Sequence, residues 1–562
     1  MSADSASAAL RSQSFHRLLG LVRPHRGRVA VAMFFMVISG AAMGAMAYII
    51  KPVLDRIFID HQVSMLVWLP LGVILIYAVK GIADYLQAIN LARVEEEVLR
   101  GLRENLFGHT LRLPLEVLID HSHGSTLSRM SLDLTLLQQG LSVLARFFLS
   151  SFQIVALLFV VFYMSWKLAL ISLITLPIAF YPLIRFGQKL RQRGNSQQEQ
   201  MGEIMDQFSQ SLRGVEVIKS QGGEPFEARR FGQQARHYFE LMMQIARIQK
   251  ATVPVMEMIA ALGIAAIIYL GGSQVVNGNM STGAFFSFFT ALGLIYEPLR
   301  QLSSANNQLQ QGLSAADRLF AWLDQPSEQT VSTTEPRPWG TWQCHDLRLQ
   351  LGQESILQGL DICIPPLSTT AFVGPSGSGK TSLIRVILGL LPASSGRITV
   401  AGMDKNQIPA GDYRSYFSFV AQEPVLFSGS ALSNIAYGED TPDPHRAEIA
   451  ARQAHAWDFL ALSGGLDSPI QGNGANFSGG QRQRLAIARA LYLDRSVLVL
   501  DEATSNLDSE SEERIAETLA ELHGKKTILI VAHRPRTRSD QSSGRGSGSG
   551  LSCPDHSQAG KS

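Results

Sequence analysis

The sequence predicts two parts of different fold class: an α-helical domain that spans a membrane six times, then an α/β domain built around a phosphate-binding loop. Three observations carry this prediction. Six uncharged apolar runs precede residue 300, and strand-like segments alternate with helix-like ones after Trp342. In addition, a glycine-rich loop ends in Lys380-Thr381. A chain of 562 residues is also too long for one hydrophobic core.

Six apolar runs define the first domain, which we place at residues 28–310. Each run has 17 to 22 residues, enough for a helix to cross a hydrocarbon core of about 30 Å. The runs are Val29 to Ile50, Val63 to Val79, Phe147 to Ser165, Leu168 to Ile184, Met258 to Val276 and Met280 to Tyr296. Six buried helices of a soluble protein are the alternative, but such helices rarely all lack charge.

The connections between the runs predict the orientation. Residues 80–146 and 185–257 form long connections, and the others are short. Eleven lysines and arginines fall in residues 185–250, against two in 51–62. By the positive-inside rule, the long connections lie on the cytoplasmic side of a plasma (inner) membrane that the chain crosses repeatedly. Residues 1–27 lack the apolar core of a removable signal peptide, so we expect this N-terminal segment to stay cytoplasmic.

Both long connections show helical periodicity, for example at Val94, Val98, Leu102 and Leu106. We expect them to extend the membrane helices into the cytoplasm and to transmit a mechanical signal from the second domain. Inert, solvated helical hairpins are the alternative.

Several ionisable residues lie near the cytoplasmic ends of the runs. They are Lys80, Asp84, Arg146, Glu257 and Glu297. Charged side chains at such ends reach water easily, which is the simpler interpretation. The alternative is that Lys80 and Arg146 face an inner cavity and contact an acidic or phosphate-bearing substrate.

The chain changes character after the last run. Residues 311–341 end in a polar stretch with prolines and are predicted to be a linker. Residues 342–535 are predicted to form the α/β domain with a largely parallel sheet. The tail, residues 536–562, has 8 serines, 5 glycines and a single large aliphatic residue, so we expect it to be disordered.

The phosphate-binding loop follows the strand-like residues 370–373 and precedes the helix-like residues 382–391. Its pattern, G-x-x-x-x-G-K-[ST], is typical of a cradle for a nucleoside triphosphate, whereas a chance glycine-rich turn would lack both flanking elements. The expected nucleotide-binding residues are Gly374, Pro375, Ser376, Gly377, Ser378, Gly379, Lys380, Thr381 and Ser382. This loop makes the second part an α/β P-loop nucleotide-binding domain.

Paired acids follow the apolar strand-like run 497–500. A carboxylate at this strand end, here Asp501, holds Mg²⁺ in P-loop proteins, and the Thr381 hydroxyl is a second expected ligand. The adjacent Glu502 is the expected group that orients or deprotonates the attacking water.

A run of small residues, Ser478-Gly479-Gly480-Gln481, precedes the helix-like LAIARAL. Small side chains at a helix start expose N–H groups to a phosphate, although an ordinary glycine-containing cap is the alternative. At this point the sequence resembles the ABC transporter superfamily, whose signature motif looks like this run.

The resemblance implies roles for further residues. Gln422 matches the family's Q-loop, which contacts Mg²⁺ and senses the membrane domain. Asp508 is similar to a D-loop residue, and His533 matches the switch histidine that contacts the γ-phosphate. We therefore expect catalytic roles for Glu502 and His533.

The resemblance covers about residues 15–534 and is greatest to bacterial lipid A flippases and multidrug exporters. Ile119 to Arg129, IDHSHGSTLSR, matches a motif in their first cytoplasmic loop. It implies a half-transporter of the exporter type, with both cytoplasmic loops docking on nucleotide-binding domains. Since each signature of this family closes over the phosphate loop of the other subunit, the expected partner is a second copy of the chain.

The sequence departs from the family pattern at four places. Leu351 stands where an aromatic residue usually stacks on adenine, Gly472 replaces an acidic residue, and Phe477 replaces a leucine before the signature. After Arg534 the sequence becomes rich in serine and glycine, as a truncation or reading-frame change in the gene would produce.

These observations predict ATP-driven export or flipping of a lipid or amphipathic compound by a homodimer, with ATP and Mg²⁺ as cofactors and membrane lipids as neighbours. A degenerate ATP-binding membrane protein with little transport is one alternative, and an ATP-gated channel is another. Net charge is only +2, with 49 basic and 47 acidic residues, so we expect no nucleic-acid partner.

Overall fold

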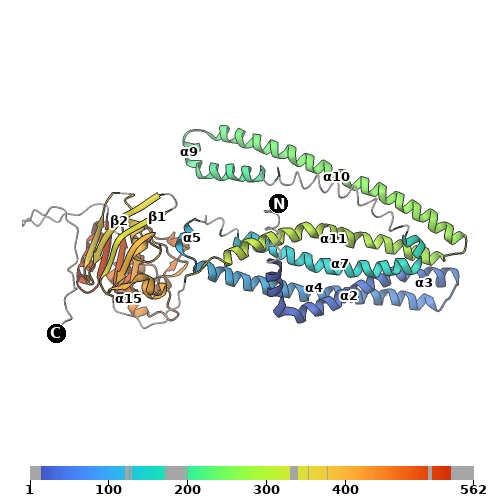
Figure 1. The fold of residues 1–562 in the computed structure, drawn as a ribbon, viewed down its shortest axis with the longest axis horizontal. Helices are drawn as coiled ribbons and strands as arrows, with labels where there is room; N and C mark the ends of the chain where they lie inside the picture. Colours follow the sequence, from blue (N-terminus) through green and yellow to red (C-terminus); the bar gives the residue numbers. More distant parts are fainter. Residues whose placement is uncertain are drawn as a thin grey trace, which may run out of the picture. The chain divides into compact units, whose positions relative to one another are not determined.

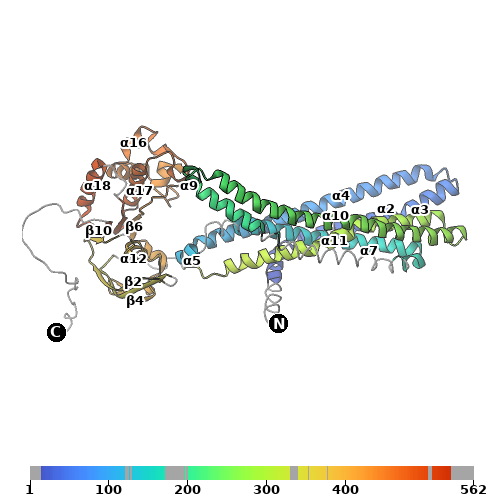
Figure 2. The ribbon, with the colours of Figure 1, turned by 90° about the horizontal axis from the view of Figure 1, so that it is seen from above.

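The computed structural model describes residues 14–120, 126, 129–170, 172, 196–197, 200–328, 339–351, 354–375, 377–503 and 509–532. The chain divides into two compact units. The membrane unit comprises Met1–Glu104 and Ser128–Ala321, and the nucleotide unit comprises Asn105–Leu127 and Trp322–Ser562. Figures 1 and 2 show long helices in the membrane unit and sheets with short helices in the nucleotide unit. The predicted boundaries at residues 310, 341 and 535 stay predictions.

Helices make up the membrane unit. Its elements are η1 (Arg23–His25), α2 (Arg26–Tyr48), α3 (Ile50–Pro52), η2 (Val53–Ile59), α4 (Met65–Leu111), η3 (Arg129–Asp133), α7 (Leu134–Met164), α9 (Val215–Ser220), α10 (Glu224–Val276) and α11 (Thr282–Leu323). Helix α4 continues 32 residues beyond the apolar run that ends at Val79, from 80 to 111, and α10 begins 34 residues before the run at Met258. The expected helical extensions are therefore present.

Four helices in the described part of the chain are long and apolar enough to cross a membrane. They lie within Ser14–Ile59, Met65–Leu111, Arg129–Met164 and Glu257–Val276. The predicted run 168–184 falls largely outside the described residues, and the run 280–296 lies within α11 except for its first two residues. Six spans therefore stay a prediction.

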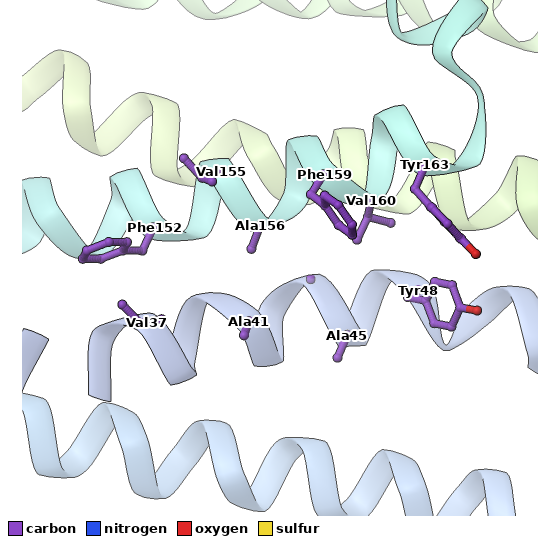
Figure 3. Close-up of a pocket in the computed structure, with 11 residues that line it drawn as sticks. Val37, Ala41, Ala45, Tyr48, Phe152, Val155, Ala156, Phe159, Val160 and Tyr163 are labelled. Atoms are coloured by element: carbon purple, nitrogen blue, oxygen red, sulfur yellow. The ribbon is translucent and has the colours of Figure 1, made fainter. Parts of the chain in front are cut away.

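Small residues bring α2 and α7 together. A Cβ atom on Gly40 would lie 3.0 Å from the backbone carbonyl group of Phe152, and one on Gly44 would lie 3.2 Å from the Ala156 oxygen. Glycine allows this close approach, as it commonly does between membrane helices. Beside the contact is a cavity of about 630 Å³ with apolar walls, and Tyr48 and Tyr163 lie at one end of it (Figure 3).

Polar pairs add to the packing of the membrane unit. Asp84 accepts hydrogen bonds from Lys80 Nζ at 2.6 Å and from Ser39 Oγ at 2.5 Å. Asp133 forms a bidentate ion pair with Arg318 of α11. Such pairs join α2 to α4 and the start of α7 to α11.

The nucleotide unit combines sheets with short helices. After α5 (Leu115–Asp120) its elements are β1 (Trp342–Leu351), β2 (Glu354–Ile364), β3 (Thr369–Val373), α12 (Lys380–Ile387), β4 (Ser395–Val400), β5 (Met403–Asp404), η4 (Lys405–Gln407), α13 (Ala410–Arg414), β6 (Phe417–Val420), β7 (Gly429–Ser430), α14 (Ala431–Ile435), α15 (Pro444–Gln453), α16 (Trp457–Ala461), η5 (Gly465–Asp467), β8 (Pro469–Ile470), η6 (Gly472–Gly474), α17 (Gly479–Leu493), β9 (Val497–Asp501), α18 (Ser509–Leu522) and β10 (Thr527–Ala532).

A parallel sheet forms the centre of the nucleotide unit. Its strand order is β3-β10-β9-β6, and all of its neighbouring pairs run parallel. A second sheet, of order β2-β1-β4-β5, is antiparallel. The prediction of a largely parallel sheet was therefore wrong for β1, β2, β4 and β5. Antiparallel neighbours such as β1 and β2 can be joined by a short turn, so they need no crossover helix.

Candidate functional site

The carboxyl ends of the parallel strands bring the predicted site residues to one edge. Val373 of β3 pairs with Ala532 of β10, and Val531 pairs with Asp501 of β9. Chain segments that leave parallel strands at their carboxyl ends emerge side by side, which is where open α/β sheets bind ligands. The phosphate loop, the paired acids and the Q-loop all begin at this edge.

The phosphate loop leads directly into the first turn of α12, which begins at Lys380. Gly377 and Gly379 have φ angles of +80° and +84°, which only glycine adopts freely. Lys380 Nζ donates to the carbonyl oxygens of Gly374 at 2.8 Å and Pro375 at 2.9 Å. Its ammonium group is thus held at the loop. Ser376 lies outside the described residues.

Asp501 is buried at the end of β9 and receives a hydrogen bond from the Thr381 side chain. Burial raises the pKa of Asp501 above its usual range, and the Thr381 hydrogen bond only partly offsets this. The positive charges of Arg385 and Lys380 also lower the pKa, and the negative charge of Glu502 raises it. The carboxylate therefore lies in a site that disfavours its negative charge when no cation is bound.

The donor set fits a magnesium ion. Asp501 Oδ1 is buried and has no hydrogen-bond partner among the described residues. A buried carboxylate oxygen without a partner is costly, and a bound cation would satisfy it. The Thr381 hydroxyl beside it supplies the second hard oxygen that Mg²⁺ prefers.

Gln422 and Glu502 meet directly although 80 residues separate them. Gln422 Nε2 donates to Glu502 Oε2 at 2.7 Å. Glu502 has a φ angle of +50°, in the left-handed region that glutamate rarely adopts. Strained backbone of this kind tends to cluster at functional sites. The geometry thus holds the predicted water-orienting carboxylate against the predicted Q-loop amide.

The signature run caps a helix. Ser478 Oγ accepts from the Gln481 N–H at 3.2 Å, and Gln481 Oε1 accepts from the Ser478 N–H at 2.9 Å. This capping box begins α17 with Gly479 and Gly480 in its first turn. A Cβ on Gly479 would meet nothing within 4 Å, so the helix start is open to a ligand or partner. Phe477 before it is buried against Phe459.

Sequence reasoning missed two residues of the site. Gln483 is buried on α17, and its Nε2 donates to the Glu502 carbonyl oxygen at 3.5 Å. Arg385 of α12 acts electrostatically on Asp501. Both lie close to motifs in the sequence, but no spacing rule singled them out. Predicted contributors Asp508 and His533 lie outside the described residues.

Besides Phe477, two departures from the family pattern lie among the described residues of this unit. Leu351 ends β1 and is partly buried against the core of the unit, and Gly472 begins η6. The tail 536–562 lies outside the described residues, as does most of the loop motif at 119–129.

Comparisons with known proteins agree with this architecture. Residues 29–299 match the family model of the ABC transporter transmembrane region, and residues 357–505 match that of the ABC transporter. A protein of Desulfotalea psychrophila named ATP-dependent lipid A-core flippase is 37% identical over 526 residues, covering 93% of this chain and 92% of that protein.

Two further relatives carry the same name. The protein of Syntrophus aciditrophicus is 36% identical over 532 residues, covering 94% of this chain and 88% of that protein. The protein of Thiobacillus denitrificans is 32% identical over 539 residues, covering 94% and 93%. With one membrane region and one nucleotide-binding domain, the chain belongs to the ABC transporters and is a half-transporter of the exporter type, whose ATP hydrolysis is coupled to transport.

Proposed function

We propose that this half-transporter works as a homodimer that uses ATP to flip a lipid, of the lipid A-core class, across the inner membrane. One observation carries the proposal: Lys380, the Thr381–Asp501 pair and the Gln422–Glu502 pair converge on one sheet edge of a chain that also has a membrane region. The relatives' names favour the lipid.

The phosphate loop is the proposed nucleotide-binding site. Backbone N–H groups at the start of α12 and the Lys380 ammonium group would bind the β- and γ-phosphates. Lys380 now donates to two loop carbonyl oxygens, and it would exchange these for phosphate oxygens. Thr381, Asp501 and Gln422 would hold Mg²⁺, which neutralises charge on the phosphates during transfer.

Hydrolysis needs a group that orients water. Glu502 is the proposed base, and its hydrogen bond from Gln422 would keep it directed at the nucleotide. His533 comes directly after β10 in the sequence, and we propose that it contacts the γ-phosphate.

A second copy completes the site. Each chain carries one phosphate loop and one signature run, and the exposed helix start at Ser478-Gly479 is a site for the γ-phosphate of the other subunit. Gly480, Gln481 and Asp508 would complete the same contact. A head-to-tail pair of identical chains supplies two such sites.

The membrane unit offers surfaces for an amphipathic molecule. The cavity between α2 and α7 is lined by apolar and aromatic side chains, which suit an acyl chain (Figure 3). Lys80 is already paired with Asp84, whereas the exposed Arg146 donates to the neutral Gln308 at 3.4 Å. Of the two, Arg146 is the better candidate to contact an anionic headgroup.

The test reconstitutes the purified chain in phosphatidylethanolamine–phosphatidylglycerol liposomes. We expect vanadate-sensitive ATP hydrolysis that rises with added lipid A-core and not with an equal charge of added phosphatidylglycerol, and ATP-dependent movement of labelled lipid A-core between leaflets. ATP hydrolysis that added lipid A-core does not stimulate would contradict the assignment of this lipid as the substrate. Absence of vanadate-sensitive hydrolysis would identify a degenerate ATP-binding protein, an ion current that outlasts hydrolysis would identify a channel, and a single ATP-bound chain in lipid would refute the homodimer.

A further inference from the structure

The cytoplasmic end of α4 is tied to the last turn of α11 and to the segment that follows it. Trp322 Nε1 donates to Thr110 Oγ1 at 2.9 Å. The Glu328 N–H donates to the carbonyl oxygen of Arg112, in the turn after α4, at 2.8 Å. All four residues belong to the nucleotide unit. Two segments that continue into membrane helices are therefore joined to each other inside this unit.

Glu328 also holds an arginine of the α/β domain. Arg414 Nη1 donates to Glu328 Oε2 at 2.6 Å, and Arg414 Nη2 donates to Glu328 Oε1 at 2.8 Å. The two side chains are only 28% and 20% exposed. Bidentate, partly buried pairs of this kind fix orientation far better than single contacts on an exposed surface.

Arg414 in turn contacts the end of the helix that begins at the phosphate loop. Its Nη2 donates to the carbonyl oxygen of Gly389 at 2.7 Å, just after α12, whose first residues are Lys380 and Thr381. Arg414 is also the last residue of α13, shortly before β6, and β6 leads to Gln422. Arg414 thus contacts the end of α12 through its guanidinium group and lies shortly before β6 in the chain.

We infer that the Glu328–Arg414 ion pair positions the end of α4 according to the nucleotide bound at the phosphate loop. A shift of α12 on nucleotide binding moves the Gly389 carbonyl group, and Arg414 passes the shift through Glu328 to the turn at Arg112. The pair touches neither nucleotide nor metal, so it is a positioning pair. The inference rests on the proposed nucleotide binding and is independent of which lipid is transported.

The test follows amide hydrogen exchange of the full chain in lipid nanodiscs, with and without ATP, Mg²⁺ and vanadate. In the wild type, trapped nucleotide should slow exchange in residues 374–387 and alter it in 105–120. In Glu328→Gln the response of 374–387 should persist, while the response of 105–120 falls by about fivefold or more. Glu448→Gln, which breaks the 2.6 Å ion pair with Arg452 in the same unit, should behave as wild type.

A double-mutant cycle separates transmission from simple folding. If the two side chains act as one unit, Glu328→Gln combined with Arg414→Gln should give the same response of 105–120 as Arg414→Gln alone. Arg414→Lys, which retains charge but not the bidentate geometry, should give an intermediate response.

Three results would overturn the inference. The first is a wild-type response of 105–120 in Glu328→Gln, and the second is an equal loss of both responses, which indicates a merely structural role. The third is absence of any nucleotide response at 374–387 in the wild type, which would refute the proposed function as well and is recognised by that double failure.

Discussion

The two units use apolar side chains in opposite ways. In β9 of the nucleotide unit, residues 497–500 are all buried. In α4 of the membrane unit, none of the most apolar 18 residues is buried within the described chain. Lipid tails solvate leucine and valine as well as a protein interior does. Burial of apolar surface therefore holds the nucleotide unit together but contributes little to the stability of the membrane unit. The membrane unit must be held by other interactions.

Close contacts and polar pairs supply those interactions. Gly140 of α7 and Gly312 of α11 approach so closely that a Cβ on Gly312 would lie 2.8 Å from the Gly140 Cα atom. On either side of this crossing, Asp133 pairs with Arg318, and Ser150 donates to Gln301 at 3.1 Å. The same two helices also share a cluster of buried apolar residues, which includes Leu157 of α7 and Phe288 of α11, so the glycine contact and the polar pairs act beside apolar packing.

The largest predicted effect concerns catalysis, because the proposed catalytic residues Glu502 and His533 both belong to the nucleotide unit. Glu502→Gln should retain ATP binding and lower hydrolysis by about 10²–10⁴-fold, because the proposed base is lost while the phosphate loop is intact. Phosphate release and retained nucleotide measure the two effects. Glu240→Gln, an exposed change on α10 of the membrane unit, is the control and should hydrolyse ATP at the wild-type rate. A Glu502→Gln variant as active as wild type would disprove the assignment of the base.

A matched pair of leucines tests burial itself. Leu529→Ala in β10 removes a fully buried side chain and should cost about 2–5 kcal/mol. Leu75→Ala in α4 changes a side chain that is 64% exposed and should cost less than about 0.5 kcal/mol. Thermal unfolding midpoints of the full chain in nanodiscs measure the difference. If Leu75→Ala is equally destabilising, that face of α4 is covered by protein, as in a homodimer, and not by lipid.

The sequence predicted those parts of the fold that have a local pattern. The apolar run before Asp501 is β9, and the run before the phosphate loop is β3. The helix expected at 382–391 begins at Lys380 and ends at Ile387 instead. Its end is set by Gly389, whose φ of +67° terminates the helix before the apolar residues that follow. Apolar content alone could not show that stop.

Long-range pairing could not be predicted in the same way. The antiparallel sheet depends on β1 pairing with both β2 and β4, and no local pattern specifies the second partner. In the site, Glu502 was predicted from its place after the strand-like run and Gln422 from the family resemblance, but their hydrogen bond joins residues 80 positions apart. Gln483 was missed because its role comes only from where α17 packs.

A matched pair of glycines tests the close packing of the membrane unit. Gly40→Ala would place a Cβ 3.0 Å from backbone atoms of Phe152, which cannot move aside easily, and should cost about 1–3 kcal/mol. Gly81→Ala in α4 meets nothing within 4 Å and should be neutral or stabilise the helix by up to about 1 kcal/mol. Unfolding midpoints in nanodiscs again give the measurement. Equal midpoints for the two variants would show that α2 and α7 separate readily.

The smallest predicted effect concerns Asp501, a buried carboxylate of the nucleotide unit whose Oδ1 atom has no hydrogen-bond partner among the described residues. Because burial raises the pKa of Asp501 in the folded chain, its ionisation opposes folding. This cost is absent below the usual aspartate pKa of about 4, appears as the pH rises through the raised value, and persists above it. Asp501→Asn should therefore raise the unfolding midpoint of the nucleotide-free protein at neutral pH, and the gain should vanish in acid.

The same variant should lose Mg²⁺-dependent ATP binding, since the substitution removes the carboxylate from the proposed set of magnesium ligands, Thr381, Gln422 and Asp501. Asp440→Asn, at an exposed loop position, should change neither property. A lower midpoint for Asp501→Asn at neutral pH would show that attractive contacts outweigh burial at this carboxylate. A higher midpoint together with lost binding would mean that Asp501 binds the cation and lowers the stability of the nucleotide-free fold. That combination is not expected at Asp84 or Asp133 of the membrane unit, because each of these carboxylates already has a cationic partner.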